Sequence, residues 1–367
     1  MWDYIRIKWG GATNDYLNSF KTYFRPLKQV FILQININVI RTLSYPRAAL
    51  IGNPSDGYFG KTIAFVFSNF AAEVELVESV KLEIIPGLRD KIMFNSLEEL
   101  ADDVELYGYY GGIRLIKASI KKFRDYCKEH SIELPQKNFT IRFSSTIPDR
   151  LGLAGSSAIV TAAIKAMMQF YGIEIVKPIL ANLIRSVEND ELKISAGLQD
   201  RVAQVYACPV FMDFDKDLIT KRGYGEYAPF DKKLLPPMYI AYRNSLSEGS
   251  EFTHNDFAKR YLNKDASVRS AVEEWAGLTD DVWRKLHSGD NNIGELLNRN
   301  FDIRNQVMTV SNGNKELVQT ARKVGASAKF TGSGGAIIGT YANEEMYEAL
   351  VVAMKQIGGE VFKPDIV

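Results

Sequence analysis

A glycine-rich turn at residues 147–158, which joins a strand-like run to a helix-like run, constrains this chain more than any other stretch. Alternate positions from Phe139 to Ile147 are mostly apolar, the period of a half-buried strand. Residues 158–171 are almost all apolar, as in a helix buried on every side. Gly152 and Gly155 let the backbone between them turn tightly and approach a ligand. Because the first amides of a helix lack internal partners and its dipole makes that end positive, the turn is suited to phosphate.

A plain strand, turn and helix with a serine cap would give the same local pattern. No Lys follows the last glycine, so the turn is not a Walker A loop. The third glycine of a dinucleotide fingerprint is also missing. Support for a phosphate site must therefore come from other parts of the chain.

Composition favours a reducing compartment. The 367 residues are 46% hydrophobic, enough for two domains, and the net charge of +1 gives no sign of a nucleic-acid partner. Cys127 and Cys208 are the two cysteines, too few for a disulfide framework. No apolar run reaches membrane-spanning length and no signal peptide is visible, so we expect a cytoplasmic protein without a membrane partner, as a monomer or homodimer.

Two further segments accompany the turn. Residues 46–56 read as a buried strand followed by a polar turn, with Arg47 and Asp56 at its two ends. Residues 331–335 form a second glycine turn before an apolar strand at 336–338. An ordinary strand and an ordinary hairpin are the simpler explanations of these two segments.

In this order the three segments resemble the motifs of the GHMP kinases, a family that includes galactokinase, homoserine kinase and mevalonate kinase. The resemblance runs from about Pro46 to the C-terminus. It implies an α+β, two-domain fold, with a ribosomal protein S5-like N-terminal domain and a ferredoxin-like C-terminal domain, and an active site in the cleft between them. We place these domains at 41–208 and 209–367, after an N-terminal extension at 1–40.

The resemblance also implies ATP and Mg²⁺ as cofactors and assigns roles to particular residues. The ATP loop comprises Pro148, Gly152, Leu153, Ala154, Gly155, Ser156, Ser157 and Ala158. The resemblance implies that Ser157 and Glu188 bind the metal, with Glu191 as the alternative to Glu188. Asp200 is the implied catalytic carboxylate and Arg47 its catalytic partner. Asp56, Gly332 and Gly334 are implied to contact the substrate.

Residues 50–56, 108–115 and 196–206 resemble plant-type glucuronokinases most, which implies phosphoryl transfer to the anomeric hydroxyl of D-glucuronate. A uronate needs a cation for its carboxylate, and we expect Arg201 ahead of Arg114, although either could be a structural ion-pair residue. Tyr110 lies in a tyrosine and glycine cluster that is either a sugar platform or a helix entry. Another acceptor (galactose, arabinose, heptose phosphate or a mevalonate-type alcohol) and a non-catalytic sensor remain alternatives.

Overall fold

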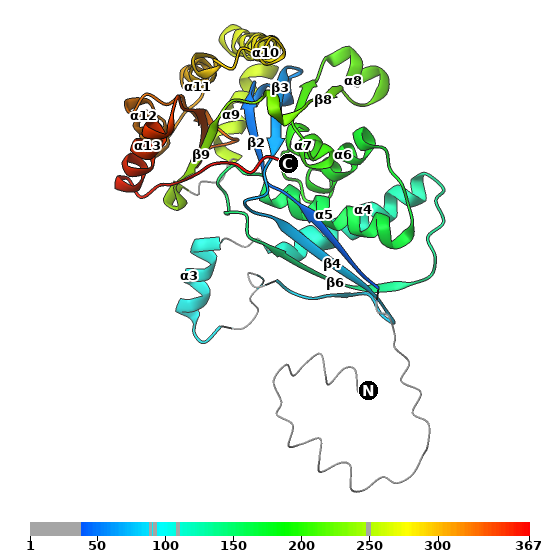
Figure 1. The fold of residues 1–367 in the computed structure, drawn as a ribbon. Coiled ribbons are helices and arrows are strands. Elements are labelled where there is room, and N and C mark those ends of the chain that lie inside the picture. Colours follow the sequence, from blue (N-terminus) through cyan, green and yellow to red (C-terminus); the bar gives the residue numbers. More distant parts are fainter. Residues whose placement is uncertain (1–37, 88–89, 91–93, 108–110, 247–250) are drawn as a thin grey trace, which may run out of the picture. The chain divides into compact units, whose positions relative to one another are not determined.

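The computed structural model describes residues 38–87, 90, 94–107, 111–246 and 251–367. The expected N-terminal extension, up to residue 37, and Tyr110 lie outside these ranges. Residues 38–367 form one compact unit, in which the described strands make three four-stranded sheets (Figure 1).

The first sheet has the strand order β1-β4-β6-β5, and β6 leads to the glycine turn. Its strands are β1 (Val39–Ser44), β4 (Ala72–Ser79), β6 (Asn138–Ser145) and the short β5 (Glu83–Ile84). β4 pairs antiparallel with both β1 and β6, and β5 pairs parallel with β6. Helices α5 and α4 lie along one face of this sheet (Figure 1). The alternation of β6 is thereby explained, since Phe139 and Ile141 are buried under these helices.

The second sheet, of order β2-β3-β7-β8, contains the strand of segment 46–56. It is built from β2 (Arg47–Ile51), β3 (Lys61–Val66), β7 (Val210–Asp213) and β8 (Glu226–Pro229), all antiparallel. The third sheet, β10-β11-β9-β12, contains β10 (Lys329–Phe330), β11 (Ala336–Thr340), β9 (Met238–Tyr242) and β12 (Glu360–Phe362). The second glycine turn is thus the connection of the antiparallel pair β10 and β11.

The helices surround these sheets. They are α3 (Leu97–Tyr107), α4 (Gly112–Glu129), α5 (Gly155–Tyr171), α6 (Lys177–Ser186), α7 (Gln199–Tyr206), α8 (Lys216–Arg222), α9 (Glu251–Leu262), α10 (Ala266–His287), α11 (Gly294–Val307), α12 (Asn312–Lys323) and α13 (Glu344–Gln356). A π-helical turn, Val187–Glu191, continues directly from α6. No helix in the described ranges is long and apolar enough to cross a membrane.

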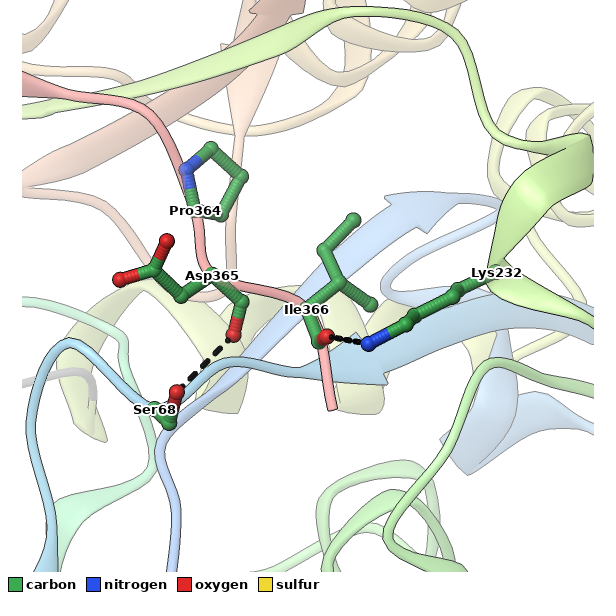
Figure 2. Close-up of a pocket in the computed structure, with 5 residues that line it drawn as sticks. All are labelled: Ser68, Lys232, Pro364, Asp365 and Ile366. Atoms are coloured by element: carbon green, nitrogen blue, oxygen red, sulfur yellow. Dashed lines mark hydrogen bonds between the residues drawn. The ribbon is translucent and has the colours of Figure 1, made fainter.

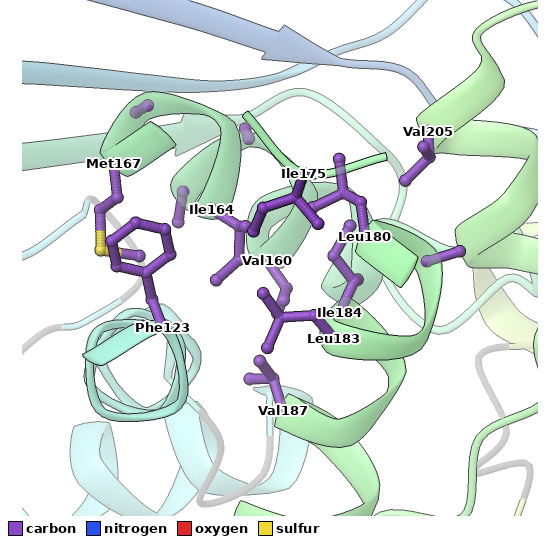
Figure 3. Packing of buried hydrophobic residues seen from close by; sticks show 14 of the residues in the cluster. Phe123, Val160, Ile164, Met167, Ile175, Leu180, Leu183, Ile184, Val187 and Val205 are labelled. Atoms are coloured by element: carbon purple, nitrogen blue, oxygen red, sulfur yellow. The ribbon is translucent and has the colours of Figure 1, made fainter. Parts of the chain in front are cut away.

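Buried side chains form three clusters. In the first, α4, α5 and α6 pack together through residues such as Phe123, Ile164 and Leu183 (Figure 3). This explains why α5 is apolar all round: it lies between the first sheet and two helices. The second cluster combines Phe65 on β3 with Trp275 on α10 and Ile338 on β11. Early and late parts of the chain therefore share one core.

Most predicted elements appear at the expected places, with three differences. Alternating apolar residues predict strand over 62–77, but the structure divides this stretch into two strands, β3 and β4, in different sheets. The sequence predicts separate helices at 266–275 and 280–287, but the structure has one continuous helix, because Gly277 is tolerated within α10. Strands β7 and β8, beyond the expected boundary at residue 208, complete the sheet that β2 and β3 begin.

Candidate active site

The glycine turn leads from β6 into α5 through three residues with left-handed backbone, of which the first is Arg150 with φ 54°. Gly152 has φ 63° and Ala154, the N-cap of α5, has φ 62°. No side chain caps this helix, and the Ser157 hydroxyl donates to the carbonyl of Ala154 at 3.1 Å. The serine cap of the simpler explanation is therefore absent from α5. Its first amides face no capping side chain, which leaves them available to an anionic ligand.

Arg47, at the start of β2, connects all three predicted segments. Its Nη1 donates to the carbonyl of Gly152 at 2.6 Å and to that of Thr331 at 3.0 Å. Its Nε donates to Oδ1 of Asp200 at 2.5 Å. The side chain is buried, so one guanidinium fixes the relative positions of the glycine turn, the second glycine turn and the first residues of α7.

Asp200 and Asp56 are neighbouring carboxylates with opposite pKa shifts. Burial alone would raise the pKa of Asp200, but the charges of Arg47 and Arg201 outweigh it and hold that pKa below its usual value. Burial, together with the charge of Asp200, raises the pKa of Asp56 to about 6. Oδ2 of Asp56 accepts a hydrogen bond from the backbone amide of Gln199 at 3.3 Å. The pair thus combines a firmly ionised carboxylate with one that gains a proton more easily.

Glu188 is buried, whereas Glu191 forms an exposed ion pair with Lys121, so Glu188 is the carboxylate that faces the glycine turn. Its Oε1 accepts from the Ser156 hydroxyl at 2.9 Å. The structure therefore brings Ser156 against Glu188, and not Ser157, whose hydroxyl is turned to the Ala154 carbonyl.

Arg201 forms a buried ion pair with Glu188. Its Nε lies 2.9 Å from Oε2 of Glu188, its Nη2 contacts the same oxygen, and its Nη1 lies 3.3 Å from Oδ2 of Asp200. Nη1 also donates to the carbonyl of Gly197 at 3.1 Å. These contacts support the structural ion-pair alternative for Arg201. Arg114, the other candidate for a substrate carboxylate, is exposed on α4.

The donor set fits Mg²⁺. One carboxylate oxygen of Glu188 and the adjacent Ser156 hydroxyl are hard oxygen ligands beside the uncapped end of α5. Mg²⁺ commonly uses one or two protein oxygens and completes its shell with phosphates and water. Within the described ranges no group of three or more His, Cys, Asp or Glu side chains converges, so an all-protein cage is not offered there.

Gly332 and Gly334, the predicted substrate contacts, lie directly against the first glycine turn. A Cβ on Gly332 would lie 2.3 Å from the carbonyl oxygen of Gly152, and one on Gly152 would lie 2.9 Å from the carbonyl oxygen of Gly334. The side-chain amide of Asn53 donates a hydrogen bond to the carbonyl of Gly332 at 3.3 Å. Glycine is required here because two backbones approach each other within a distance that no side chain allows.

Two residues of α11 that the sequence motifs do not contain also support the site. Asn300 accepts from the Gly52 amide at 2.7 Å and donates to the carbonyl of Asn53 at 3.1 Å. Arg304, one helical turn later, donates to the carbonyls of Gly332 and Ser333 at 2.8 and 2.9 Å. A charged residue in register with the buried apolar positions of this helix is the sequence signal that could have identified Arg304.

A separate hollow of about 520 Å³ lies at the C-terminal tail, lined by Ser68, Lys232, Pro364, Asp365 and Ile366 (Figure 2). Lys232 donates to the Ile366 carbonyl at 2.6 Å, and Ser68 donates to the Asp365 carbonyl at 3.3 Å. None of the predicted site residues lines this hollow. These hydrogen bonds hold the C-terminal tail against the loop after β3 and against Lys232. The hollow is distinct from the site around Arg47.

Comparisons with known proteins place this geometry in a family. A family model described as the GHMP kinases N-terminal domain matches residues 114–208. Glucuronokinase 1 of Arabidopsis thaliana is 42% identical over 80% of this chain and 83% of its own length. Probable glucuronokinase 2 of the same plant is 44% identical over 80% of this chain and 82% of its own.

Solved structures show the same fold at low identity. The Methanococcus jannaschii mevalonate kinase matches with a TM-score of 0.66 and 19% identity, over 91% of this chain and 99% of that one. The Lactococcus lactis galactokinase complexed with galactose matches with a TM-score of 0.68 and 16% identity, over 90% and 94%. The family model and the two Arabidopsis relatives show that the chain belongs to the GHMP kinase family and is an ATP-dependent kinase. Within that family it is glucuronokinase-like.

Proposed function

We propose that this kinase transfers the γ-phosphoryl group of ATP to the anomeric hydroxyl of D-glucuronate and so forms glucuronate 1-phosphate. The names of its two Arabidopsis relatives support this acceptor. The observation that carries the proposal is the convergence of three segments on Arg47, because it assembles a phosphate turn, a carboxylate and a second glycine turn around one point.

In this proposal Asp200 is the general base. The acceptor hydroxyl donates its proton to a carboxylate oxygen of Asp200 as its own oxygen forms the bond to phosphorus and the bond to ADP breaks. The lowered pKa keeps Asp200 ionised at neutral pH, which a base requires. Arg47 fixes Asp200 and places a positive charge where negative charge develops on the phosphoryl group.

ATP is proposed to lie along residues 148–158, with its phosphates against the first amides of α5. Glu188 and Ser156 would hold Mg²⁺, which neutralises phosphate charge when bound. Ser157 is buried beneath the turn and contributes through its contact with Ala154. The proposal thus keeps the metal site predicted from the resemblance but moves its hydroxyl by one residue.

Asp56 is proposed to accept hydrogen bonds from the sugar hydroxyls. It lies beside Asp200 at the N-terminal end of α7, so a ring bound there would present its anomeric hydroxyl to the base. Gly332 and Gly334 allow the second glycine turn to approach that ring closely.

The test is a panel of acceptors with MgATP: glucuronate, galactose, arabinose, glucose, heptose 7-phosphate and mevalonate. We expect glucuronate to give the highest kcat/KM, and its product to be acid-labile, as an anomeric phosphate is. A clear preference for galactose or mevalonate would refute the acceptor and leave the kinase assignment standing. Total inactivity with every acceptor, despite ATP binding, would favour a sensor.

We also propose that the protein works in the cytoplasm, as a monomer or homodimer, without nucleic acid. The near-neutral net charge and the two cysteines support this setting. Fluorescence imaging of the tagged full chain and light scattering of the purified protein test the compartment and the oligomeric state.

A further inference from the structure

Positive charge is buried in excess around the candidate site. In the described part of the chain the buried charged side chains are Arg47, Arg201, Arg304 and Lys329, against one carboxylate, Glu188. Arg47 and Arg201 have carboxylate partners in Asp200 and Glu188. Arg304 and Lys329 form no ion pair with a described residue. Burial lowers the pKa of Lys329 well below its usual value, whereas it lowers the pKa of Arg304 only to about 10, so Arg304 is a buried charge at neutral pH without an anionic partner among the described residues.

Both side chains contact the second glycine turn or the strand that leads into it. Arg304 donates one nitrogen to the carbonyl of Gly332 and another to that of Ser333, and its guanidinium carbon lies 5.0 Å from the centre of the Phe330 ring. Lys329 donates to the carbonyls of Ala49 and Phe330 at 2.7 and 2.8 Å. The charged group that directly supports the turn is therefore the buried guanidinium of Arg304.

The carbonyls bound by Arg304 determine where the amides of the same peptide groups point. In a trans peptide the C=O and N–H bonds are antiparallel, so the amides of Ser333 and Gly334 point away from the guanidinium. Neither amide donates to an acceptor within the described ranges. A Cβ on Gly152 would lie 2.9 and 3.2 Å from these two nitrogens, so a side chain at position 152 would crowd both amides.

Two unpaired amides backed by a buried guanidinium are the components of an oxyanion site. The ATP phosphates already have the uncapped end of α5 and the Ser156–Glu188 pair. The second glycine turn instead adjoins the acceptor side, because Asn53, three residues before Asp56, donates to Gly332.

We propose that Arg304 is a positioning residue that makes the Ser333 and Gly334 amides a receptor for the carboxylate of the acceptor, in place of Arg201. This inference rests on the proposed function, since it concerns the same acceptor site. Arg304 acts through the turn: it orients the two amides and adds its uncompensated charge behind them.

The test compares D-glucuronate with D-glucuronamide, which keeps the shape of the substrate and removes its charge. For Arg304→Gln we expect kcat/KM for glucuronate to fall about 10- to 100-fold, the effect of a unit charge several ångströms away at an effective dielectric of about 20. The value for glucuronamide should change by less than about threefold. Arg304→Lys keeps the charge and should keep most of the preference for glucuronate.

Arg322→Gln is the matched control. Arg322 also donates to two carbonyls, those of Asn298 and Ala328, and lies over a phenylalanine ring, but it has a carboxylate partner in Asp302 and does not touch the glycine turn. Its replacement should leave the ratio of kcat/KM for glucuronate to kcat/KM for glucuronamide unchanged. Thermal unfolding shows whether each variant folds.

The possible results distinguish failure of this inference from failure of the proposed function. An equal loss for glucuronate and glucuronamide in folded Arg304→Gln would show a merely structural role and overturn the inference, while the kinase activity of the wild type still supports the proposed function. A selective loss of ATP affinity would assign the charge to the phosphates and overturn it too. Wild-type protein that prefers a neutral sugar would refute the proposed function and the inference with it. If Arg304→Gln does not fold, loss of the preference in folded Arg304→Lys overturns the inference.

Discussion

The two aspartates at the centre of the site show how neighbours decide what a side chain can do. Asp200 is held by Arg47 and approached by Arg201, whereas the nearest described hydrogen-bond donor to Asp56 is a backbone amide. Burial raises the pKa of both carboxylates, but the charges of Arg47 and Arg201 reverse this shift for Asp200, whereas the charge of Asp200 adds to it for Asp56. Opposite shifts in adjacent carboxylates are typical of sites that move protons.

Asp200→Asn keeps the shape of the side chain and removes its charge. We expect kcat with glucuronate to fall about 10²- to 10⁴-fold, the usual range for losing a general base. ATP binding, measured by calorimetry, should stay within about threefold because Asp200 does not lie on the phosphate turn. Asp213→Asn, which removes a similarly half-buried ion-pair partner of Lys61, is the control and should retain activity. Near-normal turnover by Asp200→Asn would exclude it as the base.

Asp56 predicts a specific pH dependence. Its folded-state pKa of about 6 lies above its unfolded value of about 4, so the folded state binds this proton more tightly and loses stability as the pH rises from about 4 to 6. Asp56→Asn removes this loss. We expect the variant to unfold at a higher temperature than wild type at pH 8 and to lose that advantage at pH 4, while its KM for the sugar rises. Parallel melting curves across this pH range would contradict the assignment.

At the scale of elements, the start of α7 is built to receive Asp56. A Cβ on Gly197 would lie 2.1 Å from Oδ2 of Asp56, so only glycine allows this carboxylate to reach the Gln199 amide. The turn before α7 thus places both aspartates, Asp56 by this close approach and Asp200 by its position in the first helical turn.

Gly197→Ala should displace Asp56 and raise KM for the sugar by about tenfold or more, while KM for ATP stays within about twofold. The control is Gly277→Ala on α10, where no atom lies within 4 Å of the new Cβ; it should leave kinetics unchanged and stabilise the helix by about 0.5–1 kcal/mol. Steady-state kinetics with each substrate varied in turn decides the matter. An equal rise in both KM values would point to a general distortion instead.

For the molecule as a whole, the shared second core predicts cooperative unfolding. Trp275 on α10 is fully buried in that core and donates its indole N–H to the carbonyl of Asn300 at 3.0 Å. Strands β7 and β8 also complete a sheet begun by β2 and β3. Residues on both sides of the expected boundary at 208 therefore contribute to one core cluster and to one sheet.

We expect one calorimetric transition for the full chain, and Trp275→Ala should lower its free energy of unfolding by about 3–5 kcal/mol without splitting it. The expected N-terminal domain, 41–208, expressed alone should fail to give a cooperative transition because it exposes its part of the second core. Two separated transitions, or a stable isolated fragment, would show that the halves fold independently. Trp283→Phe, at a half-buried position on the same helix, is a milder control.

The chain's local structure and its family were readable from the sequence because they depend on short-range patterns. Alternation over 139–147 and the apolar run over 158–171 predict β6 and α5, since periodicity reports which face of an element is buried. The two glycine turns and segment 46–56 were also recognised, because close backbone approach admits only glycine and therefore leaves a fixed pattern. The assignment of functional residues within these segments stays a prediction.

Pairings between distant residues were decided by the tertiary structure alone. Nothing in the local sequence says that Ser156, not its neighbour, meets Glu188, that Arg201 is neutralised within the protein, or that Arg304 supports a turn 28 residues away. Each of these depends on how separate elements pack, and a change of one residue in helical register turns a side chain by about 100°. Sequence patterns specify the elements and their buried faces, and only the packed chain specifies which charges meet between them.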